Sequence, residues 1–212
     1  MRRFLTSILL ALLCAPIAFA QQTSTRTLSP SLEAIDQVAP HGPTRHGTLE
    51  LLEREDSQRA LREFHRMKAA GQLPVARKSE QLSAGTMQTF KVWNFEDNLY
   101  ESRDFTLEFE ADRFNIWVET EALTGGVVSA ENIEALRQSL ADSTPQGSID
   151  PNRGIIANDE IIFGDPPNVD GDSKTDVLFV DVRDGYAPGR GWTAGYVDPR
   201  DIGPPVSRDV LY

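Results

Sequence analysis

Three segments with strand-like alternation lie close together between residues 89 and 119. Apolar and polar residues alternate in 89–95, in 105–110 and in 113–119, which is the pattern of half-buried β-strands. Only residues 111–112 separate the last two segments, which is short enough for a hairpin. The chain must therefore build at least part of an antiparallel sheet. One face of the second segment is expected to carry Phe105, Leu107 and Phe109. One face of the third is expected to carry Phe114, Ile116 and Val118.

Helical and strand patterns follow this block. Ser129 caps an expected helix from Ala130 to about Leu140, and Ile155 to Gly164 predicts either a strand or a short helix. Further strands are expected over 176–182, 195–198 and 208–212. This order predicts an α+β fold, with a mixed or antiparallel sheet and one or two packed helices. No internal repeat is visible, which counts against solenoids and complete propellers.

The N-terminal part has a different composition. Residues 1–20 have the basic start, apolar run and Ala18-Phe-Ala20 cleavage site of a signal peptide, which predicts a secreted protein, extracellular or periplasmic, with no membrane anchor after cleavage. A flexible leader is expected over 21–47 and a charged helix within 48–74. That helix either packs on the domain or acts as a pro-segment. The α+β domain is expected over 86–212, truncated at its C-terminus because the chain stops within a strand-like segment.

Charge and histidine content limit the possible functions. The chain has 21 Lys and Arg against 32 Asp and Glu, a net charge of −11, so a nucleic-acid partner is not expected. The single cysteine, Cys14, lies in the signal peptide, which leaves no thiolate for catalysis. The three histidines, His41, His46 and His65, lie outside the expected core and show no zinc-helix spacing. No catalytic residue is assigned.

An acidic stretch precedes the expected strand at 176–182. Its oxygen-bearing side chains at alternating positions could turn inward and bind a hard cation, so calcium is the expected cofactor. The stretch is not an EF-hand, because its sixth position is Ser173 and its twelfth is Phe179. The alternative is a solvated turn that leads into a buried strand. The candidate metal ligands are Asn168, Asp170, Asp172 and Asp176.

Several ordered motifs resemble one protein family. These are Phe90-Lys-Val-Trp-Asn-Phe95, Phe114-Asn-Ile-Trp-Val-Glu119, Ile162-Phe-Gly-Asp165, Val169-Asp-Gly-Asp-Ser-Lys-Thr-Asp-Val-Leu-Phe-Val-Asp181 and Ala194-Gly-Tyr-Val-Asp198. Together they resemble the N-terminal half of hyicolysin-like secreted neutral zinc metallopeptidases. The resemblance implies a protein or peptide substrate and, after a strand like 210–212, a zinc-binding helix with a His-Glu-x-x-His motif.

The 212 residues contain no His-Glu-x-x-His motif. The resemblance therefore implies a non-catalytic portion that supplies the substrate-side sheet and cleft wall, with zinc only in a downstream catalytic half. The alternative is a calcium-binding adhesion or binding module, since the acidic stretch is also similar to the calcium loops of FG-GAP propeller blades. A second such loop after Tyr212 would favour adhesion, and a zinc helix there would favour the peptidase.

Overall fold

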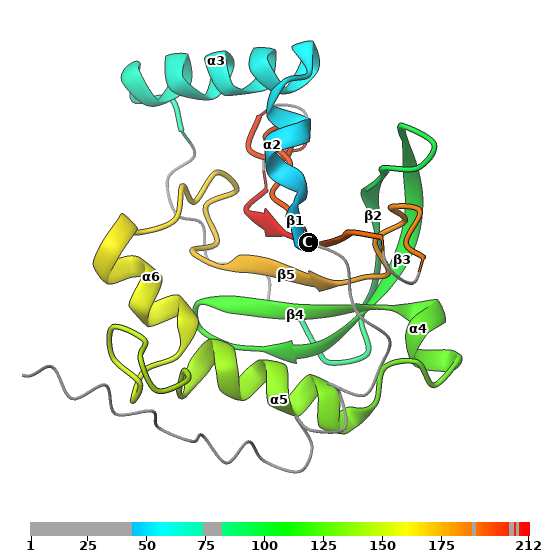
Figure 1. Ribbon diagram of the computed structural model, residues 1–212. Coiled ribbons are helices and arrows are strands. Elements are labelled where there is room, and N and C mark those ends of the chain that lie inside the picture. Colours follow the sequence, from blue (N-terminus) through cyan, green and yellow to red (C-terminus); the bar gives the residue numbers. More distant parts are fainter. Residues whose placement is uncertain (1–43, 74–81, 188–189, 204–205, 207) are drawn as a thin grey trace, which may run out of the picture. The chain divides into compact units, whose positions relative to one another are not determined.

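A five-stranded mixed sheet is the main scaffold of the structure, which is a computed structural model (Figure 1). Strands β2, β3 and β4 are antiparallel neighbours, whereas β4, β5 and β7 run parallel. Helices pack on this sheet, so the predicted α+β class with a mixed sheet is confirmed. In sheet order the strands are β2 (Met87–Asn94), β3 (Leu99–Glu110), β4 (Phe114–Glu119), β5 (Thr175–Phe179) and β7 (Val210–Leu211).

The structure describes residues 44–73, 82–187, 190–203, 206 and 208–212. All of them belong to one compact unit that extends from Ala39 to Tyr212. The expected signal peptide, most of the expected leader and His41 lie outside the described residues.

The predicted hairpin at residues 111–112 is present. The backbone N–H of Ala111 donates to the carbonyl oxygen of Phe114 at 2.9 Å, and β3 pairs with β4 in antiparallel register. The register shifts between Leu107 and Phe109, which marks a β-bulge. Phe105 and Leu107 therefore pack in one core cluster, while Phe109 packs against the other. The prediction that these three side chains share one face was wrong for Phe109.

Strand β4 is buried on both faces. Phe114, Ile116 and Val118 pack with helix α5 on one face, whereas Trp117 packs with Phe90 and other core residues on the opposite face. Trp117 is 0% exposed, so it covers a second layer rather than reaching solvent. A central strand between two apolar layers explains why nearly every residue of this segment is buried.

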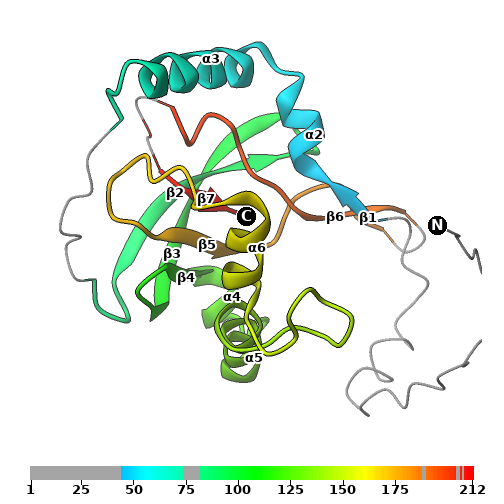
Figure 2. The same ribbon diagram turned by 90° about the vertical axis from the view of Figure 1, so that its left-hand side faces the viewer.

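The helices after β4 pack beside the core cluster that contains Phe114, Ile116 and Val118. They are α4 (Thr120–Thr124), α5 (Ala130–Ala141) and α6 (Ile155–Phe163), and α5 lies next to α6 (Figure 2). Ser129 caps α5 as predicted, and Asn132 completes a reciprocal capping box with it. Residues 155–163 form a helix, which decides between the two predicted alternatives.

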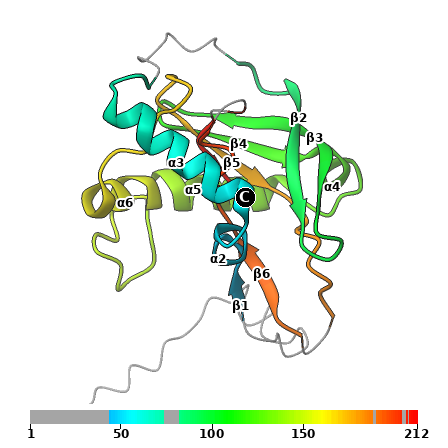
Figure 3. The same cartoon turned by 90° about the horizontal axis from the view of Figure 1, so that it is seen from above.

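The N-terminal segment departs from the sequence prediction. Residues Thr44–His46 form strand β1, which pairs in parallel with β6 (Trp192–Gly195) in a second small sheet (Figure 3). The end of the expected leader is therefore ordered by backbone pairing. Strand β6 also ends earlier than the predicted strand at 195–198, although Tyr196 still exchanges two backbone hydrogen bonds with Tyr212, each of 2.9 Å.

The expected charged helix is divided in two. Helix α2 (Gly47–Leu52) and helix α3 (Glu55–Ala69) are separated at Arg54, whose backbone is extended with ψ 142°. The break places Leu51, which is 0% exposed, in the sheet core, and Phe64 is buried on α3. A continuous helix could not bury both side chains in these positions. This segment thus contributes directly to the core.

Candidate cation site at the acidic loop

The acidic loop connects α6 to β5 and has an irregular backbone. Asn168, Gly171 and Ser173 all have positive φ, at 51°, 83° and 63°. The Asn168 side chain closes this turn, because its Oδ1 accepts from the Ser173 backbone N–H at 2.8 Å. Its Nδ2 donates to the Ser173 hydroxyl at 3.4 Å. The structure thus places Asn168 in turn formation, an ordinary use of asparagine in loops.

Asp170 and Asp172 each use one carboxylate oxygen to hold the loop. Oδ1 of Asp170 accepts from the backbone N–H of Asp172 at 3.3 Å, and Oδ1 of Asp172 accepts from the backbone N–H of Lys174 at 2.8 Å. Burial, followed by the negative charge of Asp172, raises the pKa of Asp170 to about 6. The loop therefore brings these two carboxyl groups close enough to repel each other.

Asp176 lies on β5 and is anchored to the neighbouring strand. One of its oxygens, Oδ1, accepts from Asn115 Nδ2 at 2.8 Å and from Trp117 Nε1 at 2.7 Å. Oδ2 lies 3.7 Å from Nε of Arg208. Asp176 is 5% exposed, so its main role in this structure is to satisfy two buried donors on β4.

Asp209 is an acidic neighbour of the loop that the sequence pattern did not identify. Its Oδ2 accepts from the backbone N–H of Val169 at 2.8 Å, and its own carbonyl oxygen accepts from the backbone N–H of Asp176 at 2.8 Å. Burial raises the pKa of Asp209 to about 7, and the charges of Asp170, Asp172 and Asp176 add to this effect. In the sequence Asp209 precedes an apolar segment, as Asp176 does, but nothing local to it indicates a contact with the loop.

The four predicted ligands are therefore not brought together as one set. All four side chains accept hydrogen bonds from the protein, and Asp170 and Asp172 also lie close to each other and near Asp209. Across the described residues, no group of three His, Cys, Asp or Glu side chains has metal-binding geometry. Coordination of an ion by three of these carboxylates would therefore require them to rearrange. Their oxygen-only chemistry fits a hard cation such as Ca²⁺.

A cleft lies at the end of β4, away from the acidic loop. It has a volume of about 540 Å³ and adjoins a second hollow of about 560 Å³, and both are lined by Arg103, Glu119, Glu121 and Arg183. The buried Arg103 guanidinium donates to the Asp181 carbonyl at 2.7 Å and to Glu119 at 3.3 Å. In open α/β sheets the carboxyl ends of parallel strands are common ligand sites, and the cleft lies at that end of the parallel β4–β5 pair.

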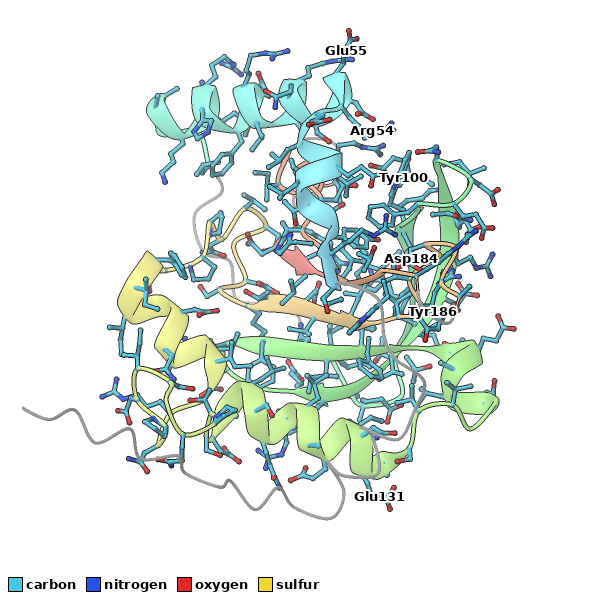
Figure 4. The ribbon with its side chains drawn as sticks, in the orientation of Figure 1. Arg54, Glu55, Tyr100, Glu131, Asp184 and Tyr186 are labelled. Atoms are coloured by element: carbon cyan, nitrogen blue, oxygen red, sulfur yellow. The ribbon has the colours of Figure 1, made fainter. Side chains whose placement is uncertain are left out.

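A group of polar and aromatic side chains joins the N-terminal helices to the sheet. The Arg54 guanidinium lies over the Trp93 ring, 4.1 Å from its centroid, and close to Tyr100 (Figure 4). The Tyr100 hydroxyl donates to Asp198 Oδ2 at 2.5 Å, and burial raises its pKa well above the ordinary value. Through Arg54 the segment 47–69 is fastened to Trp93 on β2 and to Tyr100 on β3.

A loop carboxylate fastens the second sheet. Asp184 accepts from the backbone N–H groups of Tyr186 and Thr193, and its side chain lies 3.8 Å from that of Arg45 (Figure 4). Arg45 belongs to β1 and Thr193 to β6, so Asp184 contacts both strands of the pair. Its partners make it a structural residue.

The other sequence candidates do not assemble a reactive centre. His46 and His65 are exposed on β1 and α3. Trp93 and Trp117 are buried in the core, where each packs against other apolar side chains. Trp192 is 37% exposed. In the part of the chain that the structure describes, no helix has the length and apolar composition needed to cross a membrane.

Comparison with known proteins gives a distant relative. No family model matches the chain. The neutral metalloprotease ShpI of Staphylococcus hyicus is 28% identical over 131 residues, which is 60% of this chain and 26% of the relative. The region of similarity thus spans about a quarter of that relative's length. The chain is distantly similar to a neutral metalloprotease, and this relationship extends over part of each protein.

Proposed function

We propose that this chain is the non-catalytic N-terminal portion of a secreted, hyicolysin-like zinc metallopeptidase that acts on proteins or peptides. The observation that carries the proposal is the 28% identity with a neutral metalloprotease over 60% of the chain. The ordered motifs from Phe90 to Asp198 and the signal-like N-terminus support it. Zinc and its His-Glu-x-x-His motif would belong to sequence that follows Tyr212.

The cleft at the end of β4 is the proposed substrate-facing surface. Its floor contains the buried Arg103–Glu119 pair, while Arg183 and Glu121 lie at its rim. The outer edge of β2 is a weaker candidate for adding a peptide strand. The hydroxyl of Tyr212 donates to the carbonyl of Lys91 at 3.0 Å, and the hydroxyl of Tyr196 accepts from Trp93 N–H at 3.0 Å. These two tyrosines therefore already bond to backbone groups along part of that edge.

The proposal also includes a calcium-stabilised acidic loop. Calcium that binds only the folded state raises the melting temperature further as its concentration increases. The candidate ligands remain Asn168, Asp170, Asp172 and Asp176. The close approach of Asp170 and Asp172 favours a cation between them. A secreted domain without disulfides gains stability from such an ion.

Hydrolysis by the natural protein tests the peptidase proposal. Antibodies raised against the 212-residue chain would capture the protein from the culture medium of its source. The captured protein should degrade casein, and 1,10-phenanthroline should abolish this activity. The recombinant 212-residue chain, assayed in parallel with added zinc, should show no hydrolysis. Captured protein that is folded and exported but inactive with every metal would contradict the proposal.

The adhesion module is the second candidate, and the Asp-x-Asp-Gly-Asp-like loop is the observation that favours it. A calcium-dependent increase in binding to extracellular matrix or cell surfaces would support this candidate. The peptidase proposal instead expects capture of unfolded protein or peptide substrates, without such adhesion. The two can be compared on the same purified chain, with EDTA as the control.

A further inference from the structure

We infer that Asp209 coordinates Ca²⁺ together with Asp170 and Asp172 once these carboxyl groups rearrange around the ion, and that the bound ion ties the acidic loop to strand β7. This inference deepens the calcium-binding part of the proposed function and is independent of the peptidase part. It changes the expected ligand set, since Asn168 and Asp176 become positioning residues. Asp209 reaches the loop from a distant part of the sequence.

One carboxylate oxygen of Asp209 is available to a cation. This atom, Oδ1, is buried without a hydrogen-bond donor from the described residues, and the residue is 6% exposed. The other oxygen is held by the Val169 N–H, which fixes the carboxyl group against the residue that precedes Asp170. A buried carboxylate oxygen without a partner is costly, and a cation would satisfy it.

The three carboxyl groups are oriented in the same way by the loop backbone. Asp170, Asp172 and Asp209 each bind a backbone N–H of the loop with one oxygen, at 3.3, 2.8 and 2.8 Å. This arrangement leaves Oδ1 of Asp209 without a partner among the described residues, while the Asp170 and Asp172 carboxyl groups lie against each other. Hydrogen bonds that fix the outer oxygen of a carboxylate are typical of residues around a metal site.

The negative charge of this cluster is not balanced by neighbouring side chains. Among the described residues, the nearby cationic side chains are committed to other acids. Lys174 pairs with Glu110 at 2.5 Å, and Arg208 lies 3.7 Å from Asp176. A bound cation would relieve the mutual repulsion of Asp170, Asp172 and Asp209. Donor groups that are all oxygen atoms favour Ca²⁺ over Zn²⁺.

Terbium luminescence provides a direct test on the purified chain. Trp117 donates to Asp176 at 2.7 Å, so it lies beside the acidic group and can sensitise a bound Tb³⁺ ion. Terbium emission on tryptophan excitation should rise on binding and fall as Ca²⁺ competes. Asp209→Asn should weaken Ca²⁺ affinity at least tenfold, and Asp170→Asn should do the same. Asp159→Asn, an exposed acid on α6, is the matched control and should leave affinity unchanged.

The outcomes distinguish the role of Asp209 from calcium binding by the loop as a whole. Wild-type affinity in Asp209→Asn would overturn the role of Asp209 while leaving a calcium loop in place. No terbium or millimolar calcium binding by the wild type would overturn both, without bearing on the peptidase relationship. If Asp209→Asn does not fold, hydrogen exchange of the wild type decides. Ca²⁺ should slow exchange at both 168–176 and 209–212, and protection confined to the loop would refute the inference.

Discussion

The buried carboxylate of Asp176 is expected to stabilise the sheet even when no metal is present. Asp176→Ala removes the acceptor of two buried donors, Asn115 Nδ2 and Trp117 Nε1, at 2.8 and 2.7 Å. Trp117 is 0% and Asn115 2% exposed, so water cannot replace the lost acceptor without a cavity. Each unsatisfied buried donor costs about 1–3 kcal/mol, which predicts a loss of about 2–6 kcal/mol.

Urea unfolding in EDTA measures this loss as a change in the free energy of unfolding. Asp176→Asn keeps an acceptor oxygen but loses the charge, so its cost should be about half that of alanine. Asp172→Ala is the control, since its oxygen serves one loop N–H and its cost should be about 1 kcal/mol or less. A loss below about 1 kcal/mol for Asp176→Ala would refute the anchoring role.

Three further substitutions test other parts of the structure. Burial, followed by the charge of Asp198, raises the pKa of Asp201 to about 7, so the folded state holds this proton more tightly than the unfolded chain. Metal-free protein should lose stability as the pH rises from about 4 to about 7, and thermal melts of Asp201→Asn should show a smaller loss over that range. Ser129→Ala removes the capping box of α5 and should cost about 1 kcal/mol in urea unfolding, with Ser143→Ala as a comparison at an exposed position. Gly154→Ala should cost about 1–3 kcal/mol, because its Cβ would overlap the carbonyl oxygen of Leu140; an unchanged melting temperature would refute this packing.

The strands and α5 could be predicted because their signals are local. Alternation over 105–119 and the Ser129 cap identify elements whose side chains are sorted by burial. The bulge that moves Phe109 to the other core cluster has no such signal, since it depends on pairing with β4. The break at Arg54 is similar, because burial of Leu51 against the sheet overrides a continuous helical pattern.

The acidic loop can be recognised from sequence, but the directions of its side chains cannot. An alternating pattern predicts that every second side chain points inward. Positive φ at Asn168, Gly171 and Ser173 breaks this alternation, so Asn168 bonds within the turn. Asp176 points toward Trp117 because β5 pairs with β4. Asp209 joins the loop only through the β5–β7 pairing, a long-range contact that local pattern cannot reveal.

Sequencing the gene beyond the codon for Tyr212 tests the central functional claim most directly. We predict that the reading frame continues and encodes a helix with His-Glu-x-x-His within a few dozen residues. Such a helix would supply two zinc ligands and the general base that this class of hydrolysis requires. A stop codon directly after Tyr212, together with a cooperatively folded 212-residue product, would contradict this claim and favour a free-standing calcium-binding module.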